Sequence, residues 1–287
     1  MYFEGESFDQ LYVEICNEIM NQGKNISPRG LETKEILGVI LKLKRPRSRI
    51  LNNPTRKFSL SYAFAEWLWI MKKTNKLDMI QFYAPSYHKY SDNGETLHGA
   101  YGPRIGDAIQ KVIRLLQEDP NSRRALIPIY SKNDVGMNSK DIPCTSSLQF
   151  FIRENKLDLF VHMRSNDVYL GLPYDVFTFT MIQEYVAKIL NIELGIYTHM
   201  VNSLHVYENQ YEKIRKICLY NEKEVKEMEI MPKELINNQL KYLIFAEEML
   251  RFGEIVDIEK LNDYFKSLFN YLIDYYNKLN KQEGVTT

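Results

Sequence analysis

A strand pair followed by a long apolar helix constrains the fold of this chain most strongly. Residues 148–153 and 157–164 are predicted strands, and the polar residues 154–156 between them are typical of a hairpin turn. Residues 173–190 form an apolar helix with Pro173 in its opening turn, where a missing N–H does no harm. A sheet packed against a buried helix is therefore expected, which makes the chain α/β or α+β.

The same rules predict further elements along the whole chain. They are helices over 6–22, 59–73, 105–118, 208–217 and most of 234–280, and strands within 29–50 and over 125–130 and 196–206. No repeat and no linker rich in Gly, Pro or Ser divides the sequence. We expect one domain over residues 1–287, built on a large, twisted, mostly antiparallel or mixed sheet with flanking helices.

Composition and charge exclude several classes of protein. The 37 basic residues balance the 37 acidic residues, which argues against a broadly basic nucleic-acid surface but allows a local pocket for one phosphate. The three cysteines form no CxxC pair, and no other motif has the spacing of metal ligands, so a disulfide framework or a metal site is not expected. No signal peptide and no membrane helix is predicted, so we expect a cytoplasmic protein.

Cys144 lies in DIPCTSSLQF, in a loop directly before a predicted strand. A lone cysteine is more often a small buried hydrophobe than a nucleophile. Three arginines, Arg123, Arg124 and Arg164, flank this β-rich region, and a nearby guanidinium favours the reactive thiolate. Cys144 is therefore a candidate nucleophile.

The segment MRSNDVYLGLPYD, residues 163–175, places polar side chains between a strand and a helix. It can be a loop with turn and cap hydrogen bonds, or Arg164 and Ser165 can form an anion cradle. Arg123 and Arg124 pose a related question, because neighbouring residues of a strand point to opposite faces. One of them should point toward the core side unless a partner subunit or a ligand covers it; alternatively, both lie on an exposed edge with solvated charges.

Three further residues are candidates for polar chemistry. Glu66 lies in the apolar run AFAEWLWI, where burial would raise the pKa of its carboxyl group and suit a proton shuttle; alternatively it reaches solvent past small neighbours. His205 and Tyr207 lie two apart on a predicted strand and so share a face. They can bind hydroxyl groups or form a satisfied pair in the core.

Taken in order, these segments resemble the thymidylate synthase family, which includes pyrimidine-nucleotide hydroxymethylases. The resemblance extends over residues 29–210, and the ordered set of motifs is far more specific than any one of them. The segments are Arg29-Gly30, FAEWLWI with Glu66, HGAYG with Tyr101, DPNSRR, PCTSSLQF with Cys144, RSNDVYLGLPYD and HVYENQ. The region from about 211 to 287 diverges from the usual synthase and is predicted to be helical.

The resemblance implies a role for each site residue. Cys144 would add to C6 of the pyrimidine ring and so activate C5 toward a folate-bound methylene group. The other implied roles are phosphate binding by Arg29, Arg164 and Ser165, phosphate binding in the neighbouring subunit by Arg123 and Arg124, sugar binding by His205 and Tyr207, folate binding by Asp167, Tyr87 and Gly171, and proton relay by Glu66. A homodimer that joins through the sheet and shares its active sites follows, with methylenetetrahydrofolate as co-substrate and no metal.

Four departures from the methylating synthases bear on the reaction. Asp175 stands where those enzymes carry Asn, and a carboxyl group can accept from the 4-amino group of cytosine. Tyr87 and Tyr90 stand where synthases use tryptophans to keep water out, and Thr145 follows the cysteine where they usually have His. The sequence KLNKQEGVTT lacks the apolar closing tail of a synthase, so we expect a site more open to water.

The sequence therefore predicts an enzyme that transfers a one-carbon unit to C5 of a cytidine monophosphate and adds water. dCMP is favoured as substrate, and CMP is a close second. The rival reaction is methylation of dUMP by a synthase with altered base recognition. The rival from another class is a non-catalytic nucleotide- or RNA-binding relative, against which Cys144, Glu66 and the full set of arginines argue.

Overall fold

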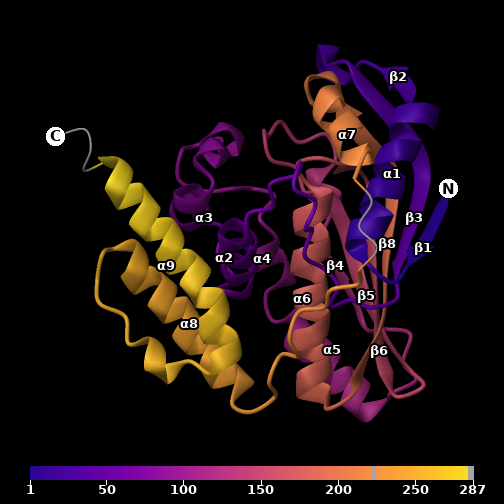
Figure 1. Cartoon of the computed structure of the whole chain (residues 1–287). Helices are drawn as coiled ribbons and strands as arrows, with labels where there is room; N and C mark the ends of the chain where they lie inside the picture. Colours follow the sequence, from indigo (N-terminus) through magenta and orange to yellow (C-terminus); the bar gives the residue numbers. More distant parts are fainter. Residues whose placement is uncertain (221–223, 284–287) are drawn as a thin grey trace. The chain divides into compact units, whose positions relative to one another are not determined.

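The computed structural model describes residues 1–220 and 224–283, and it divides the chain into two compact units (Figure 1). The first unit comprises Met1–Phe58, Asp107–Asp134 and Cys144–Glu229, and the second comprises Ser59–Gly106, Val135–Pro143 and Ile230–Thr287. That residues 1–287 act as one catalytic domain stays a prediction.

An eight-stranded mixed sheet organises the first unit. Its strand order is β1 (Tyr2–Gly5), β3 (Thr33–Leu43), β8 (Glu193–Tyr207), β6 (Lys156–Met163), β5 (Thr145–Arg153) and β4 (Leu126–Pro128), with β2 (Lys24–Ile26) paired to β3 and β7 (Asn166–Asp167) paired to β8. The pairs β1–β3, β6–β8 and β7–β8 are parallel and the others antiparallel. The expected large mixed sheet is confirmed.

Two local details differ from the sequence prediction. The hairpin turn between β5 and β6 has two residues, Glu154 and Asn155, with φ of 50° and 58°, the left-handed pair that suits the twist of a hairpin. The prediction of paired strands within residues 29–50 was wrong, because this stretch holds a single long strand, β3. Alternation of side chains identifies a strand, but its main partner, β8, lies far along the chain.

Four helices of the first unit confirm their sequence predictions: α1 (Phe8–Gln22), α5 (Ala108–Glu118), α6 (Leu172–Leu190) and α7 (Tyr211–Cys218). Helix α6 packs against β6 and β8, and most of its side chains are buried, as an apolar helix requires (Figure 1). On the central strands, Ile40, Phe160 and Met200 are exposed or partly exposed, in positions that alternate with buried neighbours.

Helices make up most of the second unit. They are α2 (Leu60–Met71), α3 (Leu77–Tyr83), α4 (Tyr101–Ile105), α8 (Ile236–Arg251) and α9 (Asp263–Glu283). The buried helix expected over 59–73 and the helices expected within 234–280 are confirmed. In the part of the chain that the structure describes, no helix has the length and apolarity needed to cross a membrane.

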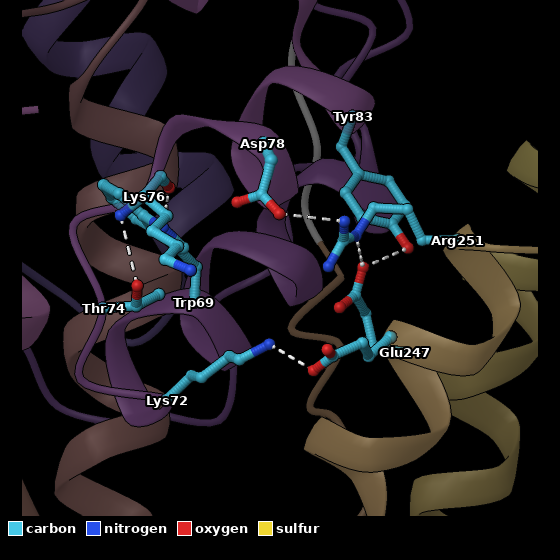
Figure 2. Close-up of polar contacts among 9 residues, drawn as sticks. Trp69, Lys72, Thr74, Lys76, Asp78, Tyr83, Glu247 and Arg251 are labelled. Atoms are coloured by element: carbon cyan, nitrogen blue, oxygen red, sulfur yellow. Dashed lines mark hydrogen bonds and ion pairs between the residues drawn. The ribbon is translucent and has the colours of Figure 1, made fainter. Parts of the chain in front are cut away.

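A buried ionic cluster ties α8 to α3 in the second unit (Figure 2). The Glu247 side chain is fully buried and accepts hydrogen bonds from Arg251 Nε at 3.0 Å and from the Tyr83 hydroxyl at 3.3 Å. Arg251 also contacts Asp78 at 3.2 Å. Burial raises the pKa of Glu247, against the opposing effect of Arg251, so the cluster stabilises α8 only as a complete set.

A second buried ion pair lies within the first unit. Arg49 forms a salt bridge with Glu184 of α6, and both side chains are fully inaccessible to solvent. Nε and Nη1 of Arg49 have no partner among the described residues. The pair therefore stabilises the unit only while both charges are present.

Removing one partner of this pair should be costly. We expect Glu184→Ala to lower the free energy of unfolding by about 3–5 kcal/mol, because it leaves a buried guanidinium uncompensated. Urea unfolding measures the change. The double substitution Arg49→Met with Glu184→Leu should recover much of the loss, and Glu193→Ala, which removes an exposed pair with Lys156, is the matched control. A loss below about 1 kcal/mol in Glu184→Ala would contradict the expectation.

Candidate active site

Cys144 directly precedes β5 and lies next to the residue that follows β6. The backbone N–H of Arg164 donates to the Cys144 carbonyl at 2.9 Å, and Arg164 Nη2 lies 3.8 Å from Cys144 Sγ. The thiol is partly exposed. The β5–β6 pairing therefore puts a guanidinium beside the candidate nucleophile, as the sequence led us to expect.

Ser165, His205 and Tyr207 come together where β7 pairs with β8. Ser165 Oγ lies 3.3 Å from His205 Nδ1. The rings of His205 and Tyr207 pack edge to face with centroids 5.2 Å apart, which confirms that the two residues share a face of the strand. The structure thus brings Arg164, Ser165 and this aromatic pair to one end of the β6 and β8 strands.

Asp167 lies on β7, opposite His205 of β8. One carboxylate oxygen accepts from the Leu170 N–H, and the other, Oδ2, is buried with no partner among the described residues. Burial raises the pKa of Asp167, while the Leu170 N–H acts in the opposite direction. A buried oxygen in this state can accept a hydrogen bond from a ligand.

Asp175 lies in the first turn of α6, and its surroundings include residues that the sequence analysis missed. Asn166 Nδ2 donates to Asp175 Oδ2 at 3.0 Å and lies 3.1 Å from His199 Nε2. The Tyr197 hydroxyl lies 2.7 Å from His199 Nδ1. The sequence offered one signal for these residues. Tyr197 and His199 occupy alternate, buried positions of β8, where a buried strand usually has apolar side chains.

Gly171 caps the N-terminus of α6 close to Asp175. A Cβ at this position would lie 3.0 Å from Asn166 Oδ1 and 3.3 Å from Asp175 Oδ2, so a larger residue would displace the carboxyl group. Thr145, the residue after the cysteine, is fully buried, and its hydroxyl has no partner among the described residues.

The three other candidate arginines, Arg29, Arg123 and Arg124, lie on the surface of the described chain. Arg29 is exposed and has a φ of 54°, followed by Gly30 with a φ of 76°. A left-handed arginine is uncommon and often marks a functional position. Of the two alternatives for Arg123 and Arg124, the structure shows the exposed one, because β4 starts only at Leu126 and both side chains are exposed.

The second unit carries Glu66, Tyr87 and Tyr101. Glu66 Oε1 accepts hydrogen bonds from the Tyr62 hydroxyl at 2.8 Å and the Tyr87 hydroxyl at 3.2 Å, and the two hydroxyls lie 2.5 Å apart. Glu66 is partly exposed, so the structure gives it both phenolic partners and some access to solvent. Tyr87 packs edge to face on Tyr90, while Tyr101 is the first residue of α4.

The catalytic and binding roles of all these residues stay predictions. No group of three or more His, Cys, Asp and Glu side chains suited to a metal ion occurs among residues 1–220 and 224–283. The sequence KLNKQEGVTT, from which we expect a site more open to water, is residues 278–287. Of these, residues 284–287 lie outside the described residues.

The fold is that of the thymidylate synthases. The thermostable thymidylate synthase A from Bacillus subtilis superposes with a TM-score of 0.70 and 23% identity, covering 80% of this chain and 91% of that chain. The sequence model of the family described as thymidylate synthase matches residues 10–250, so the chain belongs to this family.

Individual relatives carry two different names. The deoxyuridylate hydroxymethyltransferase of Bacillus phage SP01 is 30% identical over 238 residues, which cover 75% of this chain and 62% of that protein. The protein of the same name from Pseudomonas phage M6 is 32% identical over 61% of this chain and 52% of its own length. Thymidylate synthase 1 of Bacillus subtilis strain 168 is 26% identical over 72% of this chain and 82% of its own. The chain thus spans about half to three-fifths of the two phage relatives.

The protonation state of His199 predicts how the free energy of unfolding depends on pH. Burial lowers the pKa of His199 to about 3, whereas an unfolded histidine titrates near 6.5. Stability from this residue is therefore complete above about pH 6.5 and falls as pH drops toward 3, by up to about 1.4 kcal/mol per pH unit, because only the unfolded chain takes up the proton.

Between pH 7 and pH 4, we expect the free energy of unfolding to fall less in His199→Gln than in the wild type. Urea unfolding at each pH measures the free energy of both proteins. His162→Gln is the control, since this ring on β6 contacts Asn202 at 3.0 Å and is accessible to solvent. Parallel pH dependence of wild type and His199→Gln would contradict a neutral, buried His199.

Proposed function

We propose that the chain transfers a one-carbon unit to C5 of a cytidine monophosphate and completes the reaction with water, giving the 5-hydroxymethyl nucleotide. dCMP is the favoured substrate, and CMP is the close second. The observation that carries the proposal is the carboxyl group of Asp175, which receives an N–H from Asn166 at 3.0 Å and so acts as an acceptor. Methylating synthases carry an Asn in the matching position.

Base selection follows from the pattern of donors and acceptors on the pyrimidine ring. Cytosine offers a 4-amino donor and an N3 acceptor, whereas uracil offers a 4-oxo acceptor and an N3–H donor. An ionised carboxyl group only accepts, so it pairs with the amino group and is unfavourable next to the 4-oxo group. Such a mismatch discriminates strongly, because the wrong base leaves a polar group unpaired.

The proposed nucleophile is Cys144, which adds to C6 of the ring. The neighbouring Arg164 guanidinium, 3.8 Å from Sγ, supports this role because a positive charge favours the thiolate. Addition at C6 turns C5 into a carbon nucleophile, and this divides one difficult substitution into two easier steps. C5 would then lose its proton, the bond from the methylene carbon to the folate nitrogen would break with release of tetrahydrofolate, and water would add to that carbon. Elimination of the thiolate from C6 would restore the aromatic ring.

Arg164 and Ser165 are proposed to bind the 5′-phosphate, together with the exposed Arg29. A guanidinium matches phosphate oxygens with two parallel N–H bonds. His205 and Tyr207 are proposed to bind the sugar hydroxyl, and their edge-to-face packing on β8 holds the two rings side by side for this role. Nothing in this set distinguishes a 2′-hydroxyl from a 2′-hydrogen, so CMP remains an alternative to dCMP.

The proposed co-substrate is methylenetetrahydrofolate, and one residue of this chain fits its pterin ring. Asp167 Oδ2 is buried without a partner among the described residues, so an N–H of a pterin would satisfy it. When bound, the folate supplies the methylene group that C5 attacks. Gly171 and Tyr87 are the other residues proposed to lie near the folate.

We propose that water rather than hydride completes the reaction, because polar side chains replace apolar ones at the site. The Tyr87 hydroxyl, 3.2 Å from Glu66, can hold a water molecule that an indole ring would exclude. Thr145 brings a second hydroxyl next to the nucleophile in the sequence. Proton relay by Glu66 is part of the same proposal and is supported by its two phenolic partners.

A homodimer joined through the sheet is also proposed. The side chains of Ile40 and Phe160 are each 37% exposed on the central strands, which suits a face covered by a second copy. The exposed Arg123 and Arg124 would then complete the phosphate site of the neighbouring subunit, and this agrees with their absence from the core.

A second candidate is hydroxymethylation of dUMP, which the names of the two phage relatives favour. Methylation of dUMP is the alternative that the Bacillus subtilis relative favours. A nucleotide- or RNA-binding protein without activity is the alternative of another class, and the zero net charge argues against RNA binding.

One assay separates these functions. The protein is incubated with methylenetetrahydrofolate and, in turn, dCMP, CMP and dUMP, and the products are identified by mass. We expect a hydroxymethyl group on the cytidine nucleotide without accumulation of dihydrofolate. Dihydrofolate formed in step with product would establish a synthase, and preference of the wild type for dUMP would overturn the base assignment.

In the same assay, Asp175→Asn should shift preference toward dUMP. The exchange keeps the size of the side chain but turns a group that only accepts into one that also donates. We expect the ratio of kcat/KM for dCMP to that for dUMP to fall by at least about 100-fold. Asp158→Asn, on the outer part of β6, is the matched control and should leave the ratio unchanged.

The shared phosphate site predicts complementation between inactive dimers. Cys144→Ser should abolish turnover and retain nucleotide binding, and Arg123→Ala should weaken phosphate binding in the partner by about 2–3 kcal/mol. Mixing the two variants should restore part of the activity, because a hybrid dimer has one intact site. Subunit exchange is followed with a fluorescent label; exchange without recovery of activity would argue against a shared site.

A further inference from the structure

The amide nitrogen of Asn166 lies among three acceptors in the first unit. Its Nδ2 atom is 2.8 Å from Met163 Sδ, 3.0 Å from Asp175 Oδ2 and 3.1 Å from His199 Nε2. The side chain is buried, with 2% of its surface exposed. An amide nitrogen has only two hydrogens and a thioether is a weak acceptor, so the two N–H bonds go to Asp175 and His199.

The direction of these bonds depends on which nitrogen of His199 carries the hydrogen. The ring is fully buried and neutral, so one nitrogen donates and the other accepts. If Nδ1–H donates to the Tyr197 hydroxyl, Nε2 is free to accept from Asn166. If the hydrogen is on Nε2, Asn166 has to turn its oxygen toward the ring, and the N–H now donated to Asp175 is lost.

We propose that His199 is a positioning residue for base selection: as the Nδ1–H tautomer it accepts from Asn166, and this fixes the amide in the orientation that donates to Asp175. The inference rests on the proposed function, because it explains how the carboxyl group of Asp175 is kept as an acceptor for an amino group. Tyr197 holds the other side of the same ring at 2.7 Å.

The same orientation places the amide oxygen of Asn166 beside Gly171. Its Oδ1 atom is buried without a partner among the described residues, and a Cβ on Gly171 would lie 3.0 Å from it and 3.3 Å from Asp175 Oδ2. Both acceptor oxygens therefore lie tightly against Gly171, where a side chain would force the Asn166 amide or the Asp175 carboxyl group to move.

The tautomer can be measured directly and without any substrate. The nitrogen-15 NMR spectrum distinguishes protonated from unprotonated ring nitrogens of the five histidines, and His199→Gln assigns the signals. We expect Nδ1 of His199 protonated and Nε2 unprotonated. The opposite tautomer would overturn the inference whatever base the enzyme prefers, while failure of the wild type to use cytidine nucleotides would overturn the proposed function and leave this measurement valid.

Two substitutions then test the effect on specificity. His199→Phe keeps a flat ring but removes the acceptor, and we expect the ratio of kcat/KM for dCMP to that for dUMP to fall about tenfold, as for one lost hydrogen bond. His199→Gln should retain most of the ratio, because its side-chain oxygen can accept the N–H. Thr180→Val, which removes a buried hydroxyl bonded only within α6, should leave the ratio unchanged.

Thermal unfolding of each variant separates specificity from stability. A lower Tm in His199→Phe together with an unchanged ratio would mean that His199 is purely structural, and this would overturn the inference. If His199→Phe does not fold, Tyr197→Phe provides the second variant. It should raise the fraction of the Nε2–H tautomer, since it removes the oxygen that accepts from Nδ1, and an unchanged tautomer would count against the inference.

Discussion

Strand β8 provides the register from which the candidate site of the first unit takes its geometry. It pairs with β3 on one side and with β6 and then β7 on the other. Two residues, Arg164 and Ser165, separate the end of β6 from the start of β7, so they are held between two segments that share one partner strand. A shift of one residue in this pairing would turn His199 outward and remove His205 from Ser165.

The same pairing brings polar groups into an otherwise apolar interior. His199, Asn166 and Tyr197 are buried among the side chains of β8 and α6, where an unpaired polar atom is costly. Their mutual hydrogen bonds reduce this cost and connect to Asp175 at the start of α6. A network of this kind has few arrangements that satisfy its members, and this suits the role in base selection that we propose for it.

Much of the fold followed from local pattern. Helix α6 and the β5–β6 hairpin were predicted because apolar runs, a proline in the first turn and a polar turn are properties of neighbouring residues. Residues 29–50 were assigned to paired strands in error, since β3 pairs with segments outside this stretch, and its main partner, β8, lies more than 150 residues away. Strand pairing at this distance depends on loop closure and on the packing of whole faces, and neither leaves a trace in the pattern of one strand.

The sequence by itself determined the ordered motifs, and with them the candidate cysteine, the arginines and the His-Val-Tyr segment, because each is a matter of residue type and short spacing. It also led to the prediction that Asp175 stands where methylating synthases carry an Asn. Only the tertiary structure decided which groups meet: Asn166 belonged to a polar segment without a role of its own, His199 was not singled out, and the fold sets their side chains 3.1 Å apart. A hydrogen bond depends on distance and direction between atoms of separate segments, and the packing of those segments is what fixes both.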